Sequence, residues 1–118
     1  MGWWRKEVID FALDQDTARL IDEQKEWITR DPSNPAPFYR LALLYRMQGR
    51  EEEALGLLLE ALRLAPGFGD AHAALAEIHA VRGAYADAWR HARLAEAGGQ
   101  PRAAEMLRRH GIVCPEPG

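Results

Sequence analysis

The histidines His72 and His79 are the residues whose type and spacing first suggest a metal site. On a helix, seven residues separate two side chains by about 10.5 Å along the axis. Because metal ligands must converge at about 2 Å from the ion, one ion cannot bridge this pair. His110 and Cys114 have an i, i+4 spacing, but Gly111 between them interrupts a helix. We therefore expect neither a metal ion nor a cofactor.

Ser33 and Cys114 could act as nucleophiles in covalent catalysis. Such a residue needs a neighbouring base and an oxyanion donor. Ser33 lies in a turn-like segment between two prolines, and Cys114 lies in a short segment close to Pro115. The glycines Gly67 and Gly69 lack the preceding strand and the following lysine of a phosphate-binding loop. The sequence therefore predicts no enzymatic activity.

Length and composition are those of one globular domain, with 118 residues of which 47% are hydrophobic and 28% charged. The 15 basic and 18 acidic residues give a net charge of −3, so no basic excess favours a nucleic-acid partner. Charges at Arg5, Lys6 and Asp10 interrupt the N-terminal apolar residues. No apolar run approaches the roughly 20 residues of a membrane span. The sequence predicts a cytoplasmic protein with no membrane partner.

A repeat with a period of 34 residues organises the chain. At this offset the identical pairs are Leu41 and Leu75, Ala42 and Ala76, Gly49 and Gly83, Ala54 and Ala88, and Ala61 and Ala95. A fixed period of this length is typical of stacked helical units. Since β-branched residues are few and no run alternates between polar and apolar residues, an all-α fold is expected.

Each repeat unit is expected to contain two amphipathic helices. In the unit at residues 35–68, the first helix has apolar residues at i, i+3, i+4 and i+7, namely Phe38, Leu41, Ala42 and Tyr45. Asn34 and Pro35 are start signals for this helix, and Gly49 is a stop signal. The unit at residues 69–100 repeats the plan.

The unit at residues 35–68 resembles a tetratricopeptide repeat, a 34-residue helix–turn–helix with the pattern W-x2-L-G-x2-Y, A-x3-F and P. At the pattern positions it has Phe38, Leu41, Ala42, Tyr45, Ala54, Leu58 and Pro66. The next unit has His72, Leu75, Ala76, His79, Ala88 and Ala92, and its proline, Pro101, comes one residue late. The resemblance implies a right-handed helix–turn–helix solenoid.

Residues 1–34 resemble a degenerate first unit. One period before the middle unit, the sequence has Trp4, Val8, Phe11, Leu20, Trp27 and Pro32. We expect two helices in this segment. The turn between them would fall at residues 14–17, which lack glycine, so that one long helix is the alternative.

The end of the stack is expected to be closed by a capping helix at residues 101–110. Its Ala104 and Leu107 would cover the stack, while Arg108, Arg109 and His110 would face water. The predicted domain covers residues 1–110, as units 1–34, 35–68 and 69–100 followed by the cap. A loose tail is expected at residues 111–118.

The resemblance implies a concave groove lined by the first helices of successive units. Nine residues are expected to line it: Lys6, Ile9, Leu13, Arg40, Leu43, Met47, Ala74, Glu77 and Val81. Six of them are apolar, and contiguous apolar patches with polar edges tend to be binding sites. We therefore predict a non-catalytic adapter that binds a peptide or helix of a partner protein. The alternative is that some of these residues only pack against an adjacent helix.

A fold of this kind could also bind two other partners. Grooves of this family are best known for clamping the C-terminal carboxylates of chaperone tails with a lysine and an asparagine. In this chain Ile9 stands at the asparagine position, and Tyr39 and Leu43 replace both residues in the next unit, so we expect a different peptide. The alternative function is assembly into a homodimer through Trp3 and Trp4 at the N-terminal end.

Overall fold

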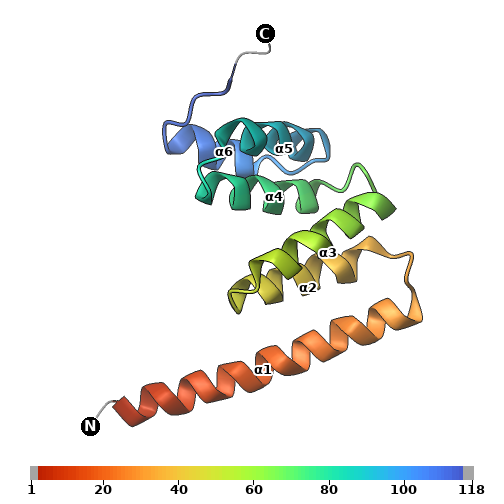
Figure 1. Ribbon diagram of the computed structural model, residues 1–118, viewed down its shortest axis with the longest axis vertical. Helices are drawn as coiled ribbons and strands as arrows, with labels where there is room; N and C mark the ends of the chain where they lie inside the picture. Colours follow the sequence, from red (N-terminus) through yellow and green to blue (C-terminus); the bar gives the residue numbers. More distant parts are fainter. Residues whose placement is uncertain (1–2, 116–118) are drawn as a thin grey trace.

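A computed structural model describes the backbone of residues 3–115 and the side chains of residues 14–115. Within this part of the chain all regular structure is helical, with no strand. The helices are α1 (Trp3–Arg30), α2 (Pro35–Met47), α3 (Glu51–Leu64), α4 (Gly69–Val81), α5 (Tyr85–Ala97) and α6 (Arg102–Arg109). They are stacked in chain order, from α1 at one end of the molecule to the α4–α6 layer at the other (Figure 1). The all-α prediction is confirmed.

The signals expected at the ends of α2 act as predicted. The side-chain oxygen of Asn34 accepts a hydrogen bond of 3.1 Å from the backbone N–H of Ala36, and Pro35 is the first helical residue. The turn glycines Gly49 and Gly83 have φ angles of 76° and 78°, where residues with a side chain are strained. Each helix pair is therefore joined by the tight glycine turn that the period predicts.

Small residues allow the two helices of each unit to pack closely. On α3 the residues that are fully buried are Ala54, Leu58 and Ala61, and on α5 they include Ala88, Ala92 and Ala95. A larger side chain at the alanine positions would force the helix axes apart. The pairs α2–α3 and α4–α5 make the most extensive contacts between elements of the described chain.

The expectation of two helices in residues 1–34 is wrong, because α1 is a single helix from Trp3 to Arg30. Residues 14–17 contain neither glycine nor proline, so nothing interrupts the i to i−4 backbone hydrogen bonds there. Asp16 also forms an i, i+3 ion pair with Arg19. The C-terminal half of α1 packs on α2 through the buried Ile21 and the partly buried Ile28.

Helix α6 covers the end of the stack, as predicted. Ala103, Ala104 and Leu107 are fully buried and join the core cluster between α4 and α5, while Arg108 is exposed. This helix begins 33 residues after α4 (Gly69 to Arg102), close to the repeat period. It therefore occupies the place of the first helix of a further unit.

None of the described helices has the length and apolar composition that a membrane span requires.

Candidate functional site

A hollow of about 450 Å³ opens between α2, α4 and α6. The residues that line it are Arg46, Glu77, Ala80, Val81, Met106, His110 and Ile112. They come from the last turns of α2 and α4, from α6 and from the segment that follows α6. The repeat stack brings these residues together, since the first helices of successive units lie on one side of it.

One edge of the hollow is an ion-pair network centred on Glu77. Arg46 of α2 lies 3.3 Å from one carboxylate oxygen of Glu77, and Arg102 of α6 lies 3.7 Å from the other. Arg102 also pairs with Asp70 at 3.1 Å and donates a hydrogen bond of 3.2 Å to the hydroxyl of Tyr39. The network joins three helices, and its two positive and two negative charges balance.

The pKa of Arg102 reflects these contacts. Burial lowers this pKa, but the hydrogen bonds to Tyr39 and Asp70 and the charge of Glu77 raise it by more, so that it lies above its ordinary value. Arg102 is therefore a permanent cation, held in place by the network at the edge of the hollow.

The floor of the hollow is apolar and open to solvent. Val81 is 82% exposed and lies beside Ala80 and Met106. Ile112 forms a further wall, and its backbone carbonyl accepts a hydrogen bond of 3.1 Å from the indole N–H of Trp89. This bond fixes the segment after α6 against α5, so the hollow has a defined shape on that side.

The expected groove residues have different positions. Glu77 and Val81 line the hollow, and Met47, next to Arg46 in sequence, is 74% exposed. Leu43 is partly buried against the core, and Ala74 is fully buried within it, so Ala74 offers no accessible surface. Arg40 is exposed and does not line the hollow. The side chains of Lys6, Ile9, Leu13, Trp3 and Trp4 lie outside the described residues.

Five lining residues were missed by the sequence reasoning: Arg46, Ala80, Met106, His110 and Ile112. Arg46 and Ala80 are related by the 34-residue period, so assigning Arg46 to the groove would have found both. Met106 is equivalent by the period to the buried His72, so the repeat pattern does not place it in the groove. The position of Ile112 depends on its bond with Trp89, which leaves no mark in the sequence.

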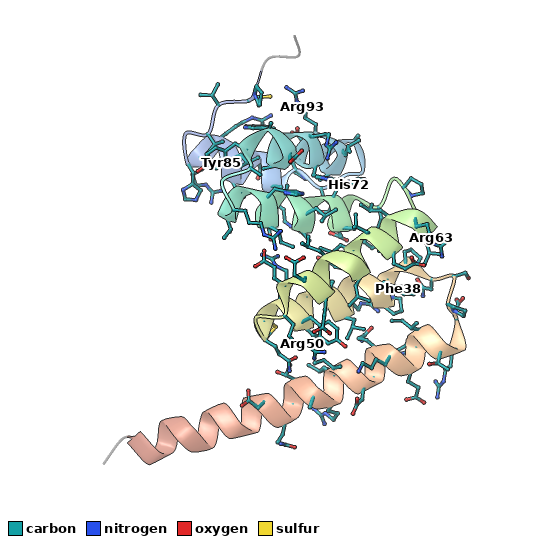
Figure 2. All side chains as sticks on the ribbon, in the orientation of Figure 1. Phe38, Arg50, Arg63, His72, Tyr85 and Arg93 are labelled. Carbon is teal, nitrogen blue, oxygen red and sulfur yellow. The ribbon has the colours of Figure 1, made fainter. Side chains whose placement is uncertain are left out.

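The histidines form a stack between α4 and α5. His72 is buried and its Nδ1 lies 3.1 Å from Nδ1 of His91, while its Nε2 lies 2.8 Å from the carbonyl oxygen of Pro66. Figure 2 shows His72 on α4, close to α5. The ring of His79 stacks on that of His91 with centroids 5.5 Å apart. Among the described residues, no three or more histidine, cysteine, aspartate or glutamate side chains are arranged so that they could hold a metal ion.

Hydrogen bonding places one proton of this stack. A carbonyl oxygen only accepts, so Nε2 of His72 donates to Pro66, while the contact between the two Nδ1 atoms of His72 and His91 needs a proton on one of them. Burial lowers the pKa of His91 to about 4, with further contributions from the charges of His72, Arg90 and His79. The sequence reasoning did not single out His91.

The two candidate nucleophiles have structural partners. The hydroxyl of Ser33 donates a hydrogen bond of 2.7 Å to Asp31 in the turn before α2. The sulfur of Cys114 accepts a hydrogen bond from Arg93 of α5. These contacts hold the turn and the C-terminal segment in place.

The model of the tetratricopeptide repeat family matches residues 14–95, which is more than half of the chain. This chain belongs to the tetratricopeptide repeat family. Domains of this family generally mediate protein–protein interactions and are generally non-catalytic. A comparison with curated proteins gave no significant match.

Proposed function

We propose that this chain is a non-catalytic adapter that binds a peptide or a helix of a partner protein in the hollow between α2, α4 and α6. The observation that carries the proposal is the exposed apolar floor, with Val81 at 82% exposure and Met106 and Ile112 beside it. Apolar surface gains about 25 cal/mol per Å² when it is removed from water. A partner side chain that fills the hollow would gain this free energy.

The charges at the edge of the hollow support an apolar ligand. Glu77 and Asp70 neutralise Arg46 and Arg102 within the network, so no net charge remains to attract an acidic or a basic peptide. The buried apolar area would then supply most of the affinity. Binding of this kind depends only weakly on ionic strength.

We predict from the sequence that the proposed adapter is a cytoplasmic protein without nucleic-acid or membrane partners. Fractionation of the source cells, with detection of the chain in each fraction, tests this location.

Capture of partners from the source lysate tests whether the hollow binds a partner protein. The Val81→Glu variant places a charge on the apolar floor, while Leu59→Glu changes an exposed leucine of α3 that does not line the hollow. We expect a specific partner to be captured by the wild type and by Leu59→Glu, and to be lost with Val81→Glu. Equal capture by all three proteins would contradict the proposal, provided that circular dichroism shows the same helix content in each.

A further inference from the structure

One side of the C-terminal half of α1 is equivalent, by the repeat period, to a fully covered side of α3 and of α5. The residues of this side on α1 are Leu20, Gln24 and Trp27. The residues 34 positions later, on α3, are Ala54, Leu58 and Ala61. The residues 68 positions later, on α5, are Ala88, Ala92 and Ala95. On α3 and α5 all six residues have an exposed fraction of 0%. In each of these units the first helix, α2 or α4, packs against the second.

On α1 this side is only partly covered. Leu20 is 40% exposed and Trp27 is 47% exposed. Between them the side-chain oxygen of Gln24 is inaccessible to solvent, yet the described residues offer it no hydrogen-bond partner. We call Leu20, Gln24 and Trp27 the acceptor face. It has the position of a helix-packing surface but lacks the helix that would cover it.

The continuous helix explains why the chain does not cover its own acceptor face. A first helix of this unit would have to turn back at residues 14–17, but these residues are helical. The N-terminal part of α1 instead extends beyond α2 and α3 (Figure 1). The segment that precedes the acceptor face in sequence is therefore carried away from it.

That segment has the sequence expected of the missing helix. On α2, which covers α3, the pattern residues Phe38, Ala42 and Tyr45 have the spacing i, i+4, i+7. One period earlier the chain has Trp4, Val8 and Phe11, with the same spacing and similar apolar character. We call residues 3–14 the donor segment. A second copy of this chain offers it as a ready-made helix.

We propose that the donor segment of one copy packs on the acceptor face of a second copy and completes its first repeat unit. The two surfaces are different, so the contact is heterologous. Each copy can donate to one neighbour and accept from another, which makes the assembly grow with concentration. The contact is separate from the hollow between α2, α4 and α6 and does not depend on ligand binding there.

Two full-length variants test the proposal through their molecular mass in solution. Phe11→Glu changes the donor segment, and Leu20→Glu changes the acceptor face. Sedimentation of the wild type should give a mass above the 13.3 kDa of one chain that rises with concentration. Because a buried unpaired charge is costly, each variant alone should associate at least ~10-fold more weakly. An equimolar mixture should form a complex of two chains, since each variant keeps the surface that the other has lost.

The control is Leu59→Glu, which changes an exposed residue of α3 and should associate as the wild type does. A wild type that stays at one chain over the whole concentration range would overturn the proposal. So would association of Phe11→Glu at wild-type strength, because the acceptor face would then pair with itself. A mixture of the two variants that stays monomeric would also overturn it, whereas loss of partner capture with Val81→Glu bears on the hollow alone.

Discussion

Arg46 of α2 and Glu77 of α4 form an ion pair of 3.3 Å that links the two complete repeat units directly. The same carboxylate lies 3.7 Å from Arg102 of α6, so one acidic residue connects the first helices of both units with the capping helix. These three helices surround the hollow. The relative position of its walls therefore depends on Glu77 as well as on the apolar core beneath it.

Replacing Glu77 by glutamine should weaken this connection. The variant leaves Arg46 and Arg102 without their shared carboxylate, and partly exposed ion pairs contribute about 0–1 kcal/mol each. We expect Glu77→Gln to lower the free energy of unfolding by about 1 kcal/mol in urea denaturation at low ionic strength. The difference from the wild type should shrink in 1 M salt because salt screens the charges. A difference that does not change with salt would show that the ion pairs are not its cause.

The stability of the fold should fall as the pH decreases from about 6.5 towards 4. His91 has a pKa of about 4 in the folded chain, against an ordinary value of 6.5. In this range the unfolded chain binds a proton at His91 that the folded chain does not, so acid favours unfolding. Thermal unfolding at pH 7 and pH 4.5 should show a larger fall in Tm for the wild type than for His91→Gln. Equal falls in both proteins would contradict this role of His91.

Two glycines should respond in opposite ways to alanine. A Cβ atom at Gly98 would lie 2.7 Å from the carbonyl oxygen of Gly67 and 2.8 Å from Cα of Gly69. These are backbone atoms that cannot move away cheaply, so Gly98→Ala should lower stability by about 1–3 kcal/mol. Gly56 lies inside α3 with open space around it, and Gly56→Ala should raise stability by about 0.5–1 kcal/mol. Chemical denaturation measures the free energy of unfolding of both variants. Equal effects would contradict the close approach of Gly98 to the segment from Gly67 to Gly69.

The bond that fixes Ile112 should also be measurable. Trp89→Phe keeps most of the buried ring but removes the N–H that donates to the Ile112 carbonyl. We expect a loss of about 1 kcal/mol in unfolding free energy, together with faster proteolysis after α6. Unchanged cleavage in the segment after α6 would show that the Trp89 bond does not hold it.

The sequence predicts the repeat units well because their signals are local. These signals act through neighbouring backbone groups, so a few residues determine where α2 begins and where α2 and α4 end. They are Asn34 with Pro35 at the start of α2, and the turn glycines Gly49 and Gly83. The 34-residue period then places Ala54 and Ala88 in equivalent buried positions. The first unit was predicted wrongly because apolar spacing alone does not break a helix, and residues 14–17 have no residue that does.

The candidate site was harder to predict because it depends on contacts between units. Ala74 and Val81 lie on the same helix and were assigned to the same groove, yet one is fully buried and the other is 82% exposed. Ala74 lies in the core cluster that α4 shares with α2 and α3, whereas Val81 is the last residue of α4. Likewise Ile112 reaches the hollow through its bond with Trp89. A pattern within one unit does not contain this information.

The proposed function requires that the hollow between α2, α4 and α6 contacts a partner protein. The most direct test places a photoreactive benzophenone amino acid at Val81, inside the hollow, or at Leu59 on α3, outside it. After irradiation in the source cells, we expect a specific cross-linked protein with the probe at Val81 and no such product with the probe at Leu59. The same product from both positions, or none from Val81, would contradict it.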